Sequence, residues 1–199
     1  MNNLVLYIHG KDGNAEEANH YKTFFREHYI IGFDYNAKTP WEAKDEFCSF
    51  IAPLSERYGR ITLIANSIGA YFAMNAEIDG LIEKAYFISP IIDMEKLIFD
   101  MMERVKVTES ALKKKNVIHT DFGEDLSWEY LSYVRTHPIQ WKTPTEILYG
   151  SEDHLTSLET ISTFSLKSNV HLTIMQGGEH YFHTDEQMKF LDQWIQRNL

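Results

Sequence analysis

Cysteine is almost absent from this sequence, since Cys48 is the single cysteine among 199 residues. One cysteine cannot form an internal disulfide, which is typical of proteins that work in a reducing compartment. The opening MNNLVLYIHG has no basic segment and no small-residue cleavage site, so we expect no signal peptide. No apolar run approaches the length that spans a bilayer. Together these absences predict a cytoplasmic protein with no membrane span.

Positive charge is also scarce, because 19 Lys and Arg residues stand against 29 Asp and Glu residues, for a formal net charge of -10. A nucleic-acid-binding domain needs a basic surface, so we expect no nucleic-acid partner. The one basic run, 113–115, is typical of a solvated helix face. A length of 199 residues, 44% of them hydrophobic, favours one globular domain with a full core. Nothing in the sequence indicates the oligomeric state.

Motifs for binding metals and phosphates are missing as well. No Cys-x-x-Cys pair occurs, and His9, His180 and His183 lack the close spacing of a metal-ligand motif. A glycine-rich phosphate loop of the G-x-x-x-x-G-K-[ST] type is also absent. We therefore expect neither a metal ion nor a cofactor.

What the sequence contains instead is a series of short apolar runs. They lack the strict alternation of a half-exposed strand, which favours parallel strands that are covered on both faces. Six runs are expected to form the sheet: 3–9, 29–34, 60–66, 84–89, 145–151 and 170–177.

Amphipathic helical patterns separate most of these runs. In residues 41–59, Phe47 and Ile51 recur at helical spacing, although Pro53 can shift the register or end the first part of the helix. The stretch 185–196 has a similar apolar stripe. Strands that alternate with helices imply right-handed crossovers. The predicted fold class is therefore α/β, with a doubly wound, mostly parallel sheet of about six strands.

One segment interrupts this alternation. The chain between the fourth and fifth expected strands is far longer than one crossover needs, and it contains amphipathic and aromatic-rich helical patterns. We expect a single domain, 1–199, with a small helical cap inserted at about 91–143. Within the cap, Met102 and Trp128 are candidates for the lining of a substrate pocket, because adaptable apolar side chains favour broad substrate acceptance.

Polar residues come after the expected strands at their carboxyl ends, where ligands bind in open α/β sheets. HGKDGN (9–14) comes after the first strand, Ser67 in ANSIG after the third, Asp153 in GSEDH after the fifth, and His180 in GGEHYFH after the sixth. Serine, aspartate and histidine in this chain order resemble the triad of the α/β-hydrolases. From His9 to the final helix the chain is similar to a small α/β-hydrolase, whereas the cap matches no sequence that we would name.

The resemblance implies that Ser67 is a nucleophile on a tight turn between a strand and a helix. The family pattern is G-x-S-x-G, and this chain has Ala65 in place of the first glycine, which is the mildest departure. The other interpretation is that Ser67 only caps the next helix, since serine is a preferred N-cap residue. Both roles are compatible, because a helix N-terminus favours developing negative charge.

The other roles are implied by the same resemblance. His180 would be the base that takes the serine proton, and Asp153 would orient it. The backbone N–H groups of Lys11 and Ile68 would form the oxyanion hole. His183, three residues after His180, is expected at the start of the final helix, because helix-start residues come directly after it.

The acid has two rivals to Asp153. Glu152 is its immediate neighbour, and Asp93 comes after the fourth expected strand, where some members of the family place the acid. Asp153 is preferred because GSED resembles the family's G-x-x-D turn after the penultimate strand.

These residues predict a serine hydrolase of the carboxylesterase kind that cleaves a small ester, thioester or amide through an acyl-enzyme. Its partner would be a small acyl substrate, whose identity and chain length no motif encodes. Two alternatives stay open: a hydrolase-like binding protein without turnover, and different chemistry on the same fold, such as carbon–carbon bond hydrolysis or cofactor-free peroxidation.

Overall fold

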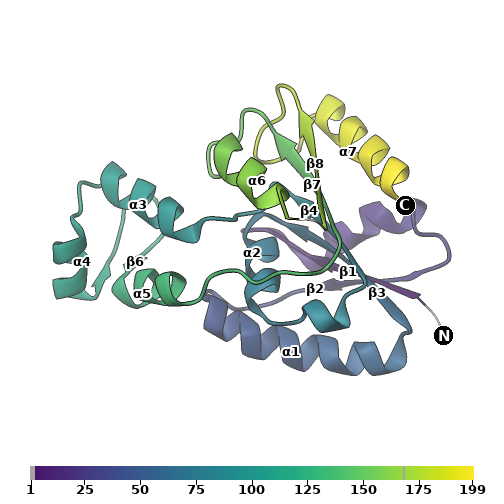
Figure 1. Ribbon diagram of the computed structural model, residues 1–199, viewed down its shortest axis with the longest axis horizontal. Coiled ribbons are helices and arrows are strands. Elements are labelled where there is room, and N and C mark those ends of the chain that lie inside the picture. The colour runs from purple at the N-terminus through teal and green to yellow at the C-terminus, as the bar shows by residue number, and fades with distance from the viewer. Residues whose placement is uncertain (1–2, 168) are drawn as a thin grey trace. The chain divides into compact units, whose positions relative to one another are not determined.

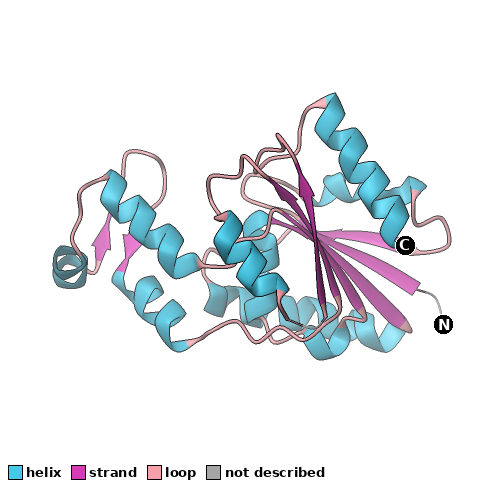
Figure 2. Cartoon of the chain, turned by 45° about the horizontal axis from the view of Figure 1, so that its top comes forward, coloured by secondary structure: helices cyan, strands magenta, loops and turns pink. Residues whose placement is uncertain are grey.

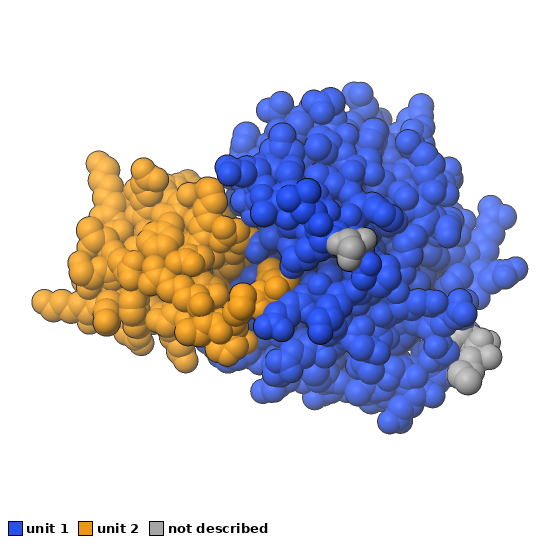
Figure 3. All heavy atoms as spheres, viewed as in Figure 1, with its two compact units in different colours: residues 1–92, 140–199 blue, residues 93–139 orange. Residues whose placement is uncertain are grey.

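The computed structural model describes residues 3–167 and 169–199 of the chain. It divides into two compact units, shown in blue and orange in Figure 3: residues 1–92 with 140–199, and residues 93–139. The second unit falls inside the segment that the sequence predicts to be an insertion, and its role as a cap stays a prediction.

The first unit is built on a parallel sheet of six strands in the order β2-β1-β3-β4-β7-β8 (Figure 1). The strands are β1 (Asn3–Ile8), β2 (Tyr29–Phe33), β3 (Arg60–Asn66), β4 (Lys84–Ile88), β7 (Thr145–Gly150) and β8 (Val170–Met175). All six strands lie within the runs that the sequence predicts. The predicted fold class is confirmed.

The central strands are buried on both faces, which explains why their sequences do not alternate. In β1, every residue from Leu4 to Ile8 is buried, because β1 pairs with β2 on one edge and β3 on the other while helices cover its faces. Figure 2 shows these strands in magenta with cyan helices on both sides.

Six helical segments accompany this sheet in the described part of the first unit. They are η1 (Ala15–Thr23), α1 (Pro40–Arg57), α2 (Ser67–Asn75), η2 (Asp79–Leu81), α6 (Leu158–Ser165) and α7 (Asp185–Asn198). Helices α1 and α2 pack against each other, whereas η1 and α7 contribute to one hydrophobic cluster on the sheet. Among the residues that the structure describes, no helix is long and apolar enough to cross a membrane.

Helix α1 continues through Pro53 without ending there. A proline in a helix removes the hydrogen bond to the carbonyl four residues earlier, which here belongs to Ser49. Ser49 and Pro53 are both exposed, so water can satisfy that carbonyl. The apolar face, with Phe47 and Ile51 fully buried, holds the helix together across the proline.

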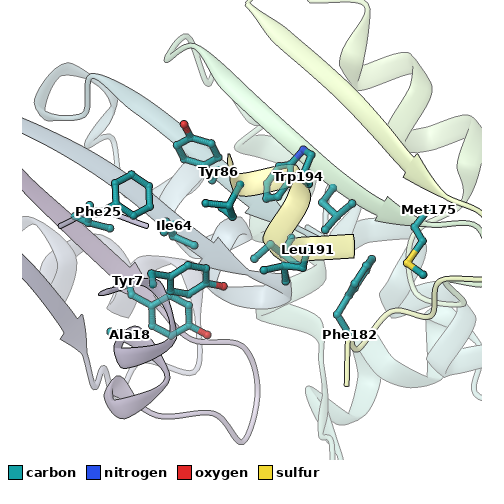
Figure 4. Packing of buried hydrophobic residues seen from close by; sticks show 14 residues of the cluster. Tyr7, Ala18, Phe25, Ile64, Tyr86, Met175, Phe182, Leu191 and Trp194 are labelled. Atoms are coloured by element: carbon teal, nitrogen blue, oxygen red, sulfur yellow. The ribbon is translucent and has the colours of Figure 1, made fainter. Parts of the chain in front are cut away.

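The core cluster between the sheet and its η1–α7 side is rich in aromatic residues (Figure 4). Tyr86 of β4 packs edge-on against Trp194 of α7, with ring centroids 5.7 Å apart. Tyr7 of β1 lies beside Tyr21 of η1, at 5.5 Å. The cluster therefore anchors the first and last helical segments of this unit to the sheet.

The second unit contains helices α3 (Met94–Arg104), α4 (Glu109–Lys115) and α5 (Trp128–Thr136). Two short strands, β5 (Val117–Ile118) and β6 (Leu126–Ser127), pair antiparallel between them. Arg135 of α5 joins the three helices, since its guanidinium contacts Glu95 at 2.6 Å and Glu109 at 2.7 Å. The sequence does not predict β5 and β6, because two residues are too few to carry a periodic pattern.

Candidate active site

The turn from β3 into α2 holds Ser67 in an uncommon backbone conformation. Its φ is +48°, in the left-handed region that non-glycine residues rarely adopt. Asn66 is the N-cap residue of α2, so Ser67 is the first helical residue and not the cap. A Cβ atom at Gly69 would lie 2.3 Å from the His9 carbonyl oxygen, so only glycine lets α2 start this close to β1. The turn presents the Ser67 side chain at the carboxyl end of the sheet.

His180 joins Ser67 to Asp153. The Ser67 Oγ lies 2.7 Å from His180 Nε2, and His180 Nδ1 lies 2.7 Å from Asp153 Oδ2. The side chain of Asp153 is 0% exposed and that of His180 is 20% exposed. With its Nδ1–H donated to the carboxylate, the imidazole presents the Nε2 lone pair to the serine hydroxyl. The imidazole is therefore placed to remove the hydroxyl proton.

The Asp153 carboxylate is held by its own turn after β7. Its Oδ1 accepts hydrogen bonds from the backbone N–H groups of Leu155, at 2.8 Å, and Thr156, at 3.1 Å. The hydroxyl of the neighbouring Tyr149 donates to the Thr156 carbonyl. Burial raises the pKa of Tyr149, and the negative charge of Asp153 raises it further. One carboxylate oxygen is thus committed to the backbone, which leaves the other for His180.

The two rival acids have other contacts. Glu152 is exposed, and its backbone N–H donates to the Gly178 carbonyl at 2.8 Å. The side chain of Asp93 is the N-cap of α3 and accepts from Lys96 N at 2.9 Å. Of the three candidate acids, Asp153 is the one whose carboxylate contacts His180.

A close approach of two backbone segments brings the Asp153 turn next to the His180 loop. A Cβ atom at Gly150 would lie 2.3 Å from the Gly178 carbonyl oxygen, so a larger residue would push the segments apart. Backbone and side-chain hydrogen bonds join the same two segments, from Ser151 N to the Met175 carbonyl at 3.0 Å and from Gly177 N to Ser151 Oγ at 2.8 Å.

His183 lies just before the final helix. Helix α7 begins at Asp185 with Thr184 as its N-cap, two residues after His183, where the sequence predicts the start. The His183 ring Nδ1 lies 2.8 Å from the Tyr181 carbonyl oxygen, and the backbone N–H donates to Gln187 Oε1. His183 is exposed and lies in the segment that leads into α7, whereas His180 is the histidine in contact with Ser67.

The loop after β1 passes directly beside Ser67. A Cβ atom at Gly10 would lie 3.4 Å from the Ser67 Cβ. The preceding His9 is stacked on Tyr35, with ring centroids 4.4 Å apart, and the Tyr35 hydroxyl donates to the His9 carbonyl at 3.0 Å. Burial raises the pKa of Tyr35, so the phenol stays protonated and keeps this bond. Lys11, the predicted oxyanion donor, comes after Gly10 on this loop with an exposed side chain.

Ile68, the other predicted donor, is the second residue of α2. The first four N–H groups of a helix have no carbonyl partner within the helix, and they point out of its N-terminus. Asn66 makes no capping bond to this turn within the described part of the chain. The N–H groups of the first turn and the helix dipole favour negative charge at this place.

A hydrogen-bond chain next to Ser67 is not predicted from the sequence. Asn66 Nδ2 donates to the Tyr7 hydroxyl at 2.7 Å, and the Tyr7 hydroxyl donates to Glu17 Oε2. Burial raises the pKa of Tyr7, and the neighbouring Tyr21 and Glu17 raise it further. One feature of the sequence could have predicted these hydrogen bonds: a tyrosine within a buried apolar run needs a partner for its hydroxyl.

The two predicted pocket residues both lie in the second unit. Met102 of α3 is buried, and Trp128, the first residue of α5, is partly buried with Lys113 Nζ 5.2 Å from its ring centroid. A role of either residue in substrate binding stays a prediction. Within residues 3–167 and 169–199, no group of three or more His, Cys, Asp or Glu side chains could hold a metal ion.

Comparison with known proteins identifies the fold. No protein-family model matches the chain, and no curated protein matches it. Est1E from Butyrivibrio proteoclasticus has a TM-score of 0.74 at 16% identity, over 99% of this chain and 86% of that one. Alpha/beta hydrolase domain-containing protein 10 from mouse has a TM-score of 0.73 at 14% identity, over 98% and 90%. A Pyrococcus furiosus esterase has a TM-score of 0.62 at 21% identity, over 99% and 80%. The chain has the α/β-hydrolase fold.

Proposed function

We propose that this chain is a serine hydrolase that cleaves a small carboxylic ester, thioester or amide. The observation that carries the proposal is the line of two 2.7 Å contacts from Ser67 through His180 to the buried Asp153 carboxylate. A serine hydroxyl is a weak nucleophile until an adjacent base takes its proton. The esterase and hydrolase names of the structural neighbours agree with this reading of the site.

In the acylation step, Ser67 Oγ attacks the substrate carbonyl carbon while its proton passes to His180 Nε2. The carbonyl oxygen becomes an oxyanion, which the N–H groups of Lys11 and Ile68 would stabilise. Each such donor is worth roughly 3–4 kcal/mol in the transition state. The tetrahedral adduct collapses when the leaving group takes the proton from His180 and departs as an alcohol, thiol or amine.

In the deacylation step, water takes the place of the leaving group. His180 removes a proton from water, the hydroxyl attacks the acyl carbon, and the proton returns to Ser67 Oγ as the carboxylic acid leaves. Asp153 stabilises the imidazolium in both steps and keeps Nδ1 protonated, so that Nε2 is always the nitrogen that faces the reaction.

Labelling with a fluorophosphonate tests this proposal, because such a probe loses fluoride only to an activated hydroxyl. We expect the adduct on the peptide that contains Ser67, and hydrolysis of short acyl esters by the unlabelled protein. Ser67→Ala should lose the adduct and lower kcat by roughly 10⁶-fold. Ser89→Ala serves as the matched control and should label like the wild type. Full ester turnover by Ser67→Ala would contradict the assignment.

A further inference from the structure

Tyr7 carries a polar hydroxyl within the buried, otherwise apolar run Leu4–Ile8 of β1. Its side chain is 1% exposed, and its hydroxyl makes two hydrogen bonds, one to Glu17 and one from Asn66 (Figure 4 shows its position in the cluster). A phenol has a single O–H proton. Since that proton goes to the Glu17 carboxylate, the Tyr7 oxygen can only accept from the amide nitrogen of Asn66. The Tyr7–Glu17 hydrogen bond thus decides which way the Asn66 amide faces.

This orientation leaves a cost at Asn66. Its Oδ1 is buried without a hydrogen-bond partner within the described residues. A buried, unpaired carbonyl of this kind destabilises the folded state, and an apolar side chain at the same place would avoid that cost. Stability alone therefore does not account for an asparagine at this position, and such exceptions are expected where function sets the residue.

The hydrogen-bond chain joins the two segments that carry the proposed oxyanion donors. At one end, Asn66 directly precedes Ser67 and Ile68 on the strained turn. At the other end, Glu17 Oε1 accepts from Asn14 N at 3.3 Å, where the loop that contains Lys11 ends.

The same loop also passes close to the Glu17 carboxylate at Gly13. A Cβ atom at Gly13 would lie 2.8 Å from Glu17 Oε1, so the loop backbone passes close to the carboxylate. Tyr7 is anchored in the sheet between both segments. The chain Glu17–Tyr7–Asn66 is therefore a brace between the loop after β1 and the turn after β3.

We propose that Tyr7, Asn66 and Glu17 are positioning residues that set the separation of the Lys11 and Ile68 N–H groups. The inference rests on the proposed function, because an oxyanion hole matters only if an oxyanion forms. The geometry must be accurate, since a misplacement of about 1 Å in a catalytic site costs roughly 10²-fold in rate. Tyr7 is only 1% exposed, so loss of its hydroxyl should affect the transition state and leave substrate binding almost unchanged.

The test compares Tyr7→Phe with Tyr86→Phe. Both changes remove one buried phenol oxygen, but the Tyr86 hydroxyl donates to the Asn198 carbonyl at the end of α7 and has no bond to Asn66 or Glu17 among the described residues. We expect Tyr7→Phe to lower kcat for an ester by about 10- to 100-fold with KM almost unchanged. Tyr86→Phe should keep the wild-type kcat. Equal kcat values for the two variants would overturn the inference.

Asn66→Ala provides a second variant, because it leaves the Tyr7–Glu17 bond intact and strands no charge. It should lower kcat in the same way, and adding it to Tyr7→Phe should cause little further loss, since both remove one shared bond. If the falls in kcat of the two single variants add up in the double variant, the two residues act separately and the inference is wrong.

Inhibition by a trifluoromethyl ketone separates positioning from loss of structure. The ketone adds to Ser67 and places an oxyanion where the substrate's would form, so its Ki should rise by the factor by which kcat falls. An unchanged Ki in Tyr7→Phe would overturn the inference while ester turnover by the wild type upholds the proposed function. A wild type with neither turnover nor labelling would overturn both.

Discussion

Two serines come directly after neighbouring strands of the sheet, and both have a positive φ of almost the same size. Ser67 directly follows β3 with φ at +48°, and Ser89 directly follows β4 with φ at +44°, while Asn66 and Ile88 before them are paired in register. The Ser67 hydroxyl is within hydrogen-bond distance of His180 Nε2, at 2.7 Å. The hydroxyl of Ser89, which is 1% exposed, has no hydrogen-bond partner among the described residues.

The two serines differ in the path that the chain takes after each strand. After Ser67 the chain continues directly into α2, which places the side chain at a helix N-terminus and within reach of the β8 loop. After Ser89 comes Pro90, whose carbonyl accepts from Thr156 Oγ1 at 2.9 Å, and the next helix starts only at Met94. A serine with a positive φ after a strand is therefore not sufficient for the proposed chemistry, because its hydroxyl also needs a base beside it.

The largest effect should come from removing the base that distinguishes Ser67 from Ser89. His180→Ala should lower kcat by roughly 10⁶-fold, since serine and base act as one unit. His183→Ala should keep most of the activity, because its ring contacts the Tyr181 carbonyl at the entry to α7. Steady-state ester hydrolysis measures both variants. An inactive His183→Ala beside an active His180→Ala would reverse the assignment.

A smaller loss is expected when the base keeps its place but loses its orienting carboxylate. Asp153→Asn should lower kcat by about 10⁴-fold, because an amide disturbs the imidazole tautomer. Asp93→Asn is a matched control, since asparagine is as good an N-cap as aspartate and α3 should keep its start. The kcat of both variants is measured. An inactive Asp93→Asn beside an active Asp153→Asn would show that the acid lies in the segment after β4.

The smallest effect should appear at the other serine, and in stability rather than in rate. Ser89→Ala keeps the positive φ but removes a buried hydroxyl that lacks a partner among the described residues, so the free energy of unfolding should rise by about 1 kcal/mol. Urea titration measures this difference, and ester hydrolysis should be unchanged. A fall in kcat would mean that Ser89 shares the work of Ser67, and the contrast between the two serines would disappear.

The six strands could be predicted because burial on both faces requires a short, continuous apolar run in the sequence. Runs such as 3–9 and 60–66 are apolar without alternation, and each contains a strand of the sheet. The path of α1 through Pro53 could not be predicted in the same way. Whether a proline ends a helix depends on which face it occupies, and solvent exposure of that face becomes known only once the helix has packed.

The juxtaposition of Ser67, Asp153 and His180 could be expected because parallel strands end at one edge of a sheet. Chain order along that edge then suggested which polar residues would meet. Asp93 and Glu152 satisfied the same rule, so the sequence left the acid open. The close packing of Gly150 against the Gly178 carbonyl brings the Asp153 turn to His180, and this contact is not visible in the sequence.

The sequence by itself determined the strand positions, the order of the polar turns and the residue types that the proposed chemistry requires. These are local properties, because they depend on the spacing of hydrophobic residues and on single residues such as Gly69. Only the tertiary structure decided which carboxylate reaches His180 and that Tyr7 links Asn66 to Glu17. Those contacts join residues far apart in the chain, and a hydrogen bond depends on tenths of an ångström that only the packed core sets.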